Sequence, residues 1–308
     1  MRLAILCSGQ AGQHRNMLDD LLVAPKCASM RQAASAVLGQ DVAQWWNALG
    51  DKEIFLNQHA QFAIACYQLS IWARIAPLLP EPDLVAGYSL GELLAYHVAG
   101  ALTAAETLRL VRARARLMDE AAAGAGSGCM VLWRGRVSPA TLAARDRAIS
   151  DYGLDIAIER RNGETVMAGP AQAIERFVAD FQALNPGMVC LPVSIPAHSR
   201  YLAQAANSFR DILEASGIVA PKIPVLAGVD AMPVRSRAAA IDALSRQIAT
   251  TIRWDGCMEA LAESGIDKAI ELGPGNDLAK LLAAEHPRVA AHAIGDFSDH
   301  HALVEWLK

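Results

Sequence analysis

The sequence lacks the patterns that mark metal-binding and disulfide-linked proteins. Its six cysteines are widely spaced and include no C-x-x-C pair: Cys7, Cys27, Cys66, Cys129, Cys190 and Cys257. Most of them have apolar neighbours, which is typical of reduced cysteines in a protein core. We therefore expect neither a zinc site nor a disulfide framework.

The sequence also lacks a large excess of positive or negative charge. The formal net charge is −4 at pH 7, and Lys and Arg occur only in short, scattered groups. Proteins that bind nucleic acid or anionic lipid usually carry a basic stripe or a basic helix face. The sequence therefore predicts no nucleic-acid partner and no membrane partner.

Long hydrophobic runs are absent as well. The longest apolar region, residues 62–79, contains Gln68 and Arg74 and has helical periodicity, so it predicts a core helix and not a membrane span. The apolar run at residues 3–7 is too short for the hydrophobic segment of a signal peptide and predicts a buried strand. Together these features predict a cytoplasmic protein.

The sequence does contain the composition and periodicity of a folded enzyme. Of its 308 residues, 53% are hydrophobic and 19% are charged, which excludes the disordered class. Short apolar runs at residues 3–7, 84–86, 224–229 and 268–272 alternate with long helical patterns rich in Ala and Leu. This alternation predicts an α/β fold with a largely parallel, buried sheet.

One segment breaks this alternation. It contains an apolar run at 130–133, a helical pattern at 139–149, a hairpin pattern at 156–169, a helix at 171–184 and a strand at 188–193. The Asn162-Gly163 pair suits a tight hairpin turn. The order β-α-β-β-α-β predicts a ferredoxin-like subdomain at residues 129–195. This subdomain would be inserted in a core formed by residues 1–128 and 196–308.

The first candidate for catalysis is Ser89, in the segment LVAGYSLGELL. Gly87-x-Ser89-x-Gly91 follows an apolar run and precedes a helical pattern, as the nucleophile does in many α/β enzymes. The backbone N–H of Leu90, at the start of that helix, would lie where an oxyanion forms. Alternatively, Ser89 is only a small residue at a tight corner. Glu92 is interpreted as an ordinary acid in the first helical turn.

Two further residues stand out. Arg114 projects into the middle of the apolar arc of a long helix, where a guanidinium needs an anion. An internal Asp or Glu is the simpler partner, and a substrate carboxylate is the alternative. Among eight histidines, His198 lies in a loop just after a predicted strand, where a catalytic base is often found. Spacing alone does not exclude the other histidines as the catalytic base.

Five segments together resemble one family, the malonyl-CoA:acyl-carrier-protein acyltransferases. They occur in the family's order: GYSLGE, LVRARARLMDEA, LPVSIPAHS, RQIATTIRW and ELGPGNDL. The resemblance implies an α/β-hydrolase-like core with an inserted ferredoxin-like subdomain. It also implies transfer of malonyl from malonyl-CoA to the thiol on the phosphopantetheine-type arm of an acyl carrier protein, with no bound cofactor or metal.

The resemblance also implies roles for individual residues. Ser89 would be the nucleophile and His198 its base, with the histidine oriented by the backbone carbonyl of Gln247. Arg114 would bind the free carboxylate of the malonyl group, which reverses the preference for an internal partner.

Three more positions are carried over from the family. Gln10 matches the oxyanion-hole glutamine region, with Leu90 supplying the second N–H. Gln58 resembles a glutamine of the acyl pocket.

The chain departs from the family pattern at two places. Tyr88 stands where the family usually has His, and Ser8 and Ala11 alter the usual Phe-Pro-Gly-Gln-Gly sequence around Gln10. Tyrosine before the nucleophile is similar to the branch that serves malonate decarboxylase, the epsilon-subunit transacylase that loads malonyl onto a dedicated carrier protein.

Three alternatives to the malonate decarboxylase role stay open. The first is a malonyl-CoA transacylase of fatty acid or polyketide synthesis. The second is a serine thioesterase or hydrolase, which predicts a carboxylate partner for His198. The third is a non-catalytic subunit that docks a carrier protein.

Overall fold

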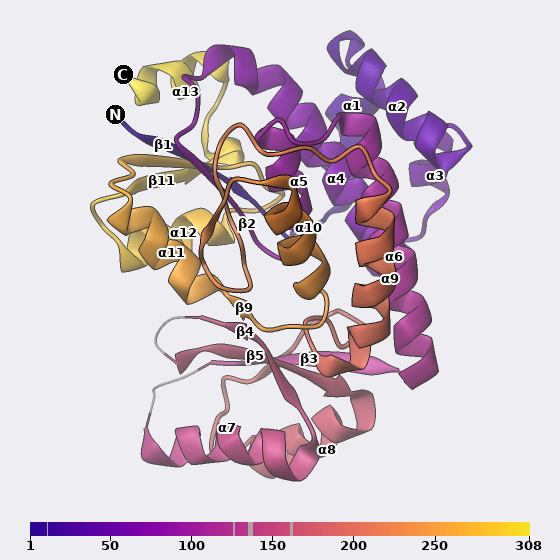
Figure 1. Ribbon diagram of the computed structural model, residues 1–308, viewed down its shortest axis with the longest axis vertical. Helices are drawn as coiled ribbons and strands as arrows, with labels where there is room; N and C mark the ends of the chain where they lie inside the picture. Colours follow the sequence, from indigo (N-terminus) through magenta and orange to yellow (C-terminus); the bar gives the residue numbers. More distant parts are fainter. Residues whose placement is uncertain (11, 126, 135–137, 161–162) are drawn as a thin grey trace.

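The computed structural model describes residues 1–308 except 11, 126, 135–137 and 161–162. The chain forms two sheets (Figure 1). The first has six strands in the order β11-β10-β1-β2-β7-β8: β1 (Leu3–Cys7), β2 (Leu84–Gly87), β7 (Val225–Leu226), β8 (Pro233–Val234), β10 (Lys268–Glu271) and β11 (Ala290–Ala293). All neighbours are parallel except β7 and β8. The predicted α/β fold with a largely parallel sheet is confirmed.

Helices of the core bury the central strands of this sheet, whereas the edge strands β8 and β11 are partly exposed. These helices are α1 (Asp19–Val23), α2 (Ala28–Leu38), α3 (Val42–Ala48), α4 (Asn57–Ile75), α5 (Leu90–Val98), α6 (Ala104–Ala125), α9 (Ala203–Glu214), α10 (Arg237–Arg246), α11 (Trp254–Glu263), α12 (Asp277–Glu285) and α13 (His300–Leu307). Helix α5 packs on β1 and β2, while α4 and α6 pack on each other beside it (Figure 1). Because β1 and β2 are covered on both faces, they are uniformly buried and read as unbroken apolar runs.

The second sheet, at the bottom of Figure 1, has the order β6-β3-β5-β4-β9. Its strands are β3 (Gly128–Trp133), β4 (Asp155–Glu159), β5 (Thr165–Pro170), β6 (Val189–Cys190) and β9 (Ile252–Arg253). Helices α7 (Pro139–Tyr152) and α8 (Ala171–Phe181) pack on each other and enclose a small separate core. Strand β9 comes from outside the proposed subdomain at 129–195 and pairs with β4, so the second sheet is not built from that segment alone.

Three expectations about strands need correction. The strand expected at 188–193 is only Val189–Cys190, because Pro192 has no N–H to donate to the ladder. The strand expected at 224–229 is only Val225–Leu226. The sequence AAHA of β11 was not identified as a strand, since it has no β-branched or aromatic residue. In the hairpin of β4 and β5, Asn162 lies outside the described residues, and Gly163 has φ of +75°.

The described cysteines are all free, but not all are core residues. Four are buried, whereas Cys129 is partly exposed and Cys190 is exposed on β6, contrary to the expectation for the set. No helix in the described part of the chain is both long enough and apolar enough to cross a membrane.

Candidate active site

Ser89 lies in a strained turn between β2 and α5. Its backbone has φ of 57° and ψ of −115°, a conformation that a residue with a side chain rarely adopts. The flanking glycines allow the turn to form. A Cβ at Gly87 would lie 2.2 Å from the carbonyl oxygen of Gly91, and a Cβ at Gly91 would lie 2.0 Å from that of Cys7. The turn therefore requires glycine at both positions and presents the Ser89 hydroxyl at the N-terminus of α5.

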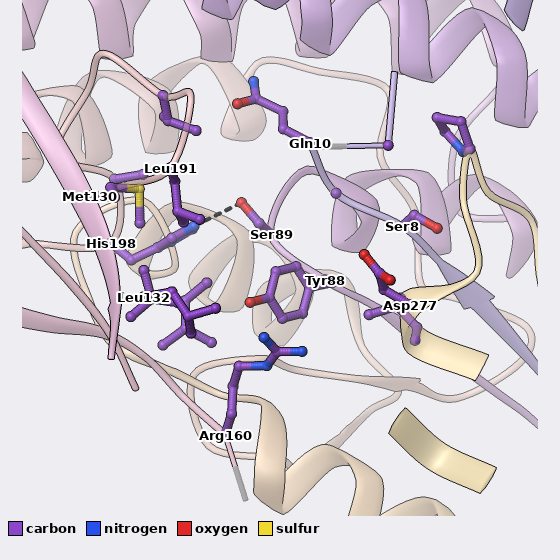
Figure 2. Close-up of a pocket in the computed structure, with 18 of the residues that line it drawn as sticks. Ser8, Gln10, Tyr88, Ser89, Met130, Leu132, Arg160, Leu191, His198 and Asp277 are labelled. Carbon is purple, nitrogen blue, oxygen red and sulfur yellow. Dashed lines mark hydrogen bonds between the residues drawn. The ribbon is translucent and has the colours of Figure 1, made fainter. Parts of the chain in front are cut away.

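The parallel pairing of β1 with β2 brings a second loop to the same place. Cys7 and Gly87 are partners at the ends of these strands, so the chain leaves both strands at one edge of the sheet. The loop after β1 and the turn at Ser89 then line a common cavity of about 240 Å³. The second sheet forms the opposite wall through apolar side chains such as Met130 and Leu132 (Figure 2).

Ser89 and His198 point toward each other across this cavity (Figure 2). The Ser89 Oγ lies 2.7 Å from His198 Nε2, and His198 Nδ1 lies 2.6 Å from the backbone oxygen of Gln247. A carbonyl oxygen can only accept, so Nδ1 carries the proton and Nε2 accepts from the serine hydroxyl. Among the described residues, no carboxylate is hydrogen-bonded to the His198 ring.

The environment keeps the His198 ring neutral. Its side chain is buried, and burial together with the nearby Arg114 charge lowers its pKa to about 3, despite the hydrogen bond to Gln247 that favours the protonated form. An unprotonated imidazole at neutral pH can take a proton from Ser89 at once. This geometry and charge state would allow His198 to act as the base for Ser89, and that role stays a prediction.

The lowered pKa of His198 predicts that kcat/KM does not fall with decreasing pH in the range usual for a histidine base. With acetyl-CoA, whose acyl group has no carboxylate, we expect kcat/KM to show no inflection near 6.5 and to stay level from about pH 8 to about pH 5. A base with a pKa of about 3 is lost only below that range. Stopped-flow measurement of CoA release would check this. A fall in kcat/KM centred near pH 6.5 would contradict the lowered pKa of His198.

Arg114, on α6, is 3% exposed. It donates to the side-chain oxygen of Gln61 at 2.7 Å and to that of Gln247 at 3.2 Å, and one nitrogen lies 3.5 Å from Ser89 Oγ. Burial lowers its pKa to about 10, so it remains cationic at neutral pH. Within the described residues it forms no ion pair with a carboxylate, so the internal Asp or Glu partner is not found.

Gln247 joins the parts of the site. Its backbone oxygen accepts from His198, its side-chain oxygen accepts from Arg114, and its side-chain nitrogen donates to the backbone oxygen of Ser89 at 2.9 Å. The same nitrogen donates to Glu92 Oε2 at 2.7 Å. One glutamine thus contacts the serine, the histidine and the arginine.

Glu92 is a residue whose importance the sequence interpretation missed. It is fully buried and also accepts from the backbone N–H of Gly228 at 2.9 Å, so it is not an ordinary acid on a solvated helix turn. The signal was present, because α5 is apolar on nearly every side and a helix of that kind is buried all round.

The predicted oxyanion-hole residues come from two segments, the start of α5 and the loop after β1. Leu90 is the first residue of α5, where no preceding carbonyl of the helix is available to its N–H. Gln10 lines the cavity, and its side chain donates to Asn57 Oδ1 at 2.9 Å. Their role at an oxyanion stays a prediction. Of the two altered positions beside Gln10, Ser8 donates to Glu271 at 2.6 Å, and Ala11 lies outside the described residues.

Gln58 does not line this cavity, and its identification as an acyl-pocket glutamine stays a prediction. It lines a separate surface hollow with Trp45 and Arg112. On α4 the glutamine that contacts Arg114 is Gln61, less than one turn after Gln58. A glutamine inside the apolar pattern of that helix was the available signal.

Tyr88 also lines the cavity, beside Arg160 (Figure 2). Its ring meets that of Trp254 edge to face, with centroids 5.2 Å apart, and burial raises its pKa to about 12. Tyr88 therefore forms a neutral wall of the cavity.

Within the described residues, no group of three His, Cys, Asp or Glu side chains is placed to bind a metal ion.

Known proteins are similar to this chain over most of its length. Residues 5–291 match the acyl transferase domain family. The chain is 33% identical over 290 residues to the polyketide biosynthesis protein ThaF of Burkholderia thailandensis. This match covers 93% of the present chain but only 24% of ThaF. The present chain is also 29% identical to the malonyl CoA-acyl carrier protein transacylase of Haemophilus influenzae, and the match covers 99% of both chains.

A solved structure is similar over the same extent. A malonyl-transacylase in complex with a type II polyketide synthase acyl-carrier protein superposes with a TM-score of 0.90, at 28% identity and over 99% of both chains. The chain thus spans about a quarter of ThaF but nearly all of the stand-alone transacylases.

Proposed function

The chain belongs to the acyl transferase domain family, and from this premise we propose that it is a malonyl-CoA:acyl-carrier-protein S-malonyltransferase that works through an ester on Ser89. The observation that carries the proposal is the 2.7 Å contact of Ser89 Oγ with a neutral, buried His198. Family membership supports the acyl transfer, and the Ser89–His198 geometry supports the route.

In the first half-reaction Ser89 Oγ attacks the thioester carbonyl of malonyl-CoA while His198 Nε2 takes the hydroxyl proton. The oxyanion that forms accepts hydrogen bonds from the backbone N–H groups of Leu90 and Gln10. The carbon–sulfur bond then breaks, and His198 returns the proton to the leaving sulfur of CoA. Malonyl remains as an ester on Ser89.

The second half-reaction runs the same steps in reverse. The thiol of the carrier's arm gives its proton to His198 and attacks the ester, and Ser89 Oγ leaves and recovers the proton. Throughout, Gln247 holds the histidine through its backbone oxygen and stabilises the imidazolium that forms in each half. The carboxylate of the malonyl group pairs with Arg114, which lies 3.5 Å from Ser89 Oγ.

The structure gives less support to a hydrolase. A thioesterase of this type predicts a carboxylate partner for His198, whereas the partner observed is a backbone carbonyl. A non-catalytic docking subunit has no use for a neutral histidine 2.7 Å from a serine held in a strained turn.

Intact-mass measurement after mixing with malonyl-CoA tests the proposal. We expect a mass gain of one malonyl group per chain that disappears when an acyl carrier protein with its arm is added. Absence of any gain would rule out the transferase. A gain lost at the same rate in buffer alone would indicate a hydrolase.

For the acceptor, we propose the dedicated carrier protein of malonate decarboxylase, on the strength of Tyr88 beside the nucleophile. The transacylases of fatty acid and polyketide synthesis are the alternative, and the named relatives fit that alternative equally well. Transfer from the malonyl-enzyme to each purified carrier separates the two. We expect at least about tenfold faster transfer to the decarboxylase carrier, which requires only about 1.4 kcal/mol of discrimination. Faster transfer to the fatty-acid carrier would overturn this choice.

A further inference from the structure

Among the residues that the structure describes, Arg114 forms hydrogen bonds with neutral groups only. Its two short hydrogen bonds, to Gln61 and Gln247, both end on amide oxygens. A buried guanidinium usually pairs with a carboxylate, because an isolated charge is costly to remove from water. A carboxylate in direct contact would, however, occupy the fork that the substrate needs.

A carboxylate does lie behind one of these amides. The side-chain nitrogen of Gln247 faces two oxygens, that of the Ser89 backbone and Oε2 of Glu92 at 2.7 Å. Both accept when Glu92 is ionised, so the amide nitrogen must face them and the amide oxygen must face Arg114. Glu92 is thereby fixed one amide away from the guanidinium.

The side chain of Gln61, the second amide bonded to Arg114, is also connected to a carboxylate, but through one more residue. Gln61 donates to Asn57 Oδ1 at 2.6 Å, and Asn57 donates to Asp119 Oδ1 at 2.8 Å. Two amides therefore separate Asp119 from Arg114, and Asp119 is partly exposed to solvent, which weakens its field.

We propose that Glu92 is the resident counter-ion of Arg114, placed one amide away so that the guanidinium stays open to the substrate carboxylate, and that it sets the preference for malonyl. Glu92 acts through Gln247 and is a positioning and charge-balancing residue. The inference rests on the proposed function.

The charges around Glu92 make this balance depend on pH. The titratable groups that interact with it are Tyr96 of α5, Arg114 of α6, Asp230 beyond β7 and Cys257 of α11. Burial raises the Glu92 pKa to about 7, while Arg114 and the hydrogen bonds from Gly228 and Gln247 oppose the rise. Below this pKa Glu92 is neutral and Arg114 attracts the malonyl carboxylate without competition. Above it the ionised Glu92 competes.

The ratio of kcat/KM for malonyl-CoA to that for acetyl-CoA isolates this effect, since steps common to both donors cancel. In the natural protein we expect the ratio to fall about three- to tenfold between about pH 6 and pH 8.5. In the isosteric Glu92→Gln variant it should stay flat at the low-pH value. Asp119→Asn should change the ratio less than Glu92→Gln. The proposal would be overturned if the ratio changed with pH in Glu92→Gln as it does in the natural protein. It would also be overturned if Glu92→Gln lowered kcat/KM equally for malonyl-CoA and acetyl-CoA, or if Asp119→Asn changed the ratio more than Glu92→Gln.

A measurement on the natural protein covers the case in which Glu92→Gln does not fold. Malonylation of Ser89 releases CoA thiol and consumes no proton, so net uptake reports Glu92. Calorimetry in two buffers at pH 7 should show uptake of about 0.4 proton per chain; zero uptake would refute the role of Glu92. Failure to form the malonyl ester at all would instead refute the proposed function.

Discussion

Replacing Ser89 by Ala should abolish the malonyl adduct and lower transfer to the carrier protein by at least about 10⁴-fold, or about 5 kcal/mol of transition-state stabilisation. The loss is large because the hydroxyl at 2.7 Å from His198 forms the bond to the acyl group, and no other group in the cavity replaces it. The turn itself should survive, since Ala is no larger than Ser and Gly87 and Gly91 are unchanged. Intact mass and a carrier-loading assay would measure both effects.

A matched control comes from the exposed thiol on β6. Cys190 could accept malonyl from CoA by thiol exchange without any active site. Cys190→Ala should therefore form the full adduct at the natural rate, whereas Ser89→Ala should form none. An adduct that survives in Ser89→Ala and disappears in Cys190→Ala would place the acyl group on the wrong residue and refute the mechanism.

Replacing Arg114 by Ala should lower kcat/KM for malonyl-CoA by about 10²- to 10³-fold, because truncating one partner of a buried charge pair costs several kcal/mol. The loss with acetyl-CoA should be less than about tenfold, since that acyl group offers no carboxylate to bind. The protein's preference between the two donors would thereby narrow or invert. Steady-state rates with both donors, at equal carrier concentration, measure this change.

Two variants on the same helix sharpen this experiment. Arg114→Lys keeps the charge but loses the planar fork, so it should recover only part of the malonyl activity. Arg116→Ala removes an exposed arginine that pairs with Glu120 on the helix surface and should leave both donors unaffected. Equal losses with malonyl-CoA and acetyl-CoA in Arg114→Ala would return Arg114 to a structural role.

The parts of the site that follow from local sequence pattern could be predicted. The strand–turn–helix around Ser89 follows from two glycines that allow an otherwise clashing turn, and the burial of Arg114 follows from helical periodicity. The spatial convergence of His198, Gln247 and Ser89 came only from family resemblance. These contacts join residues 49 to 158 positions apart, and contacts of such long range leave no local periodic signal.

The features that the local pattern did not indicate have the same physical origin. Gln58 and Gln61 differ by less than one helical turn on α4, and periodicity alone does not say which of them contacts Arg114 of α6. Glu92 looked ordinary because acids are frequent in first helical turns. Its partner Gln247 is 155 positions away, so only the packed structure identifies the carboxylate as buried and bonded.

The small strand β9 has a mechanical consequence for the cavity. It fastens the second sheet, which carries the apolar wall, to the segment that follows Gln247. The His198 ring and its backbone N–H are both tethered to that segment, through Gln247 and Ile248. The apolar wall and His198 are thus connected through one chain segment. An outward movement of the wall to admit a bulky arm would therefore displace the histidine that accepts the proton in the proposed mechanism.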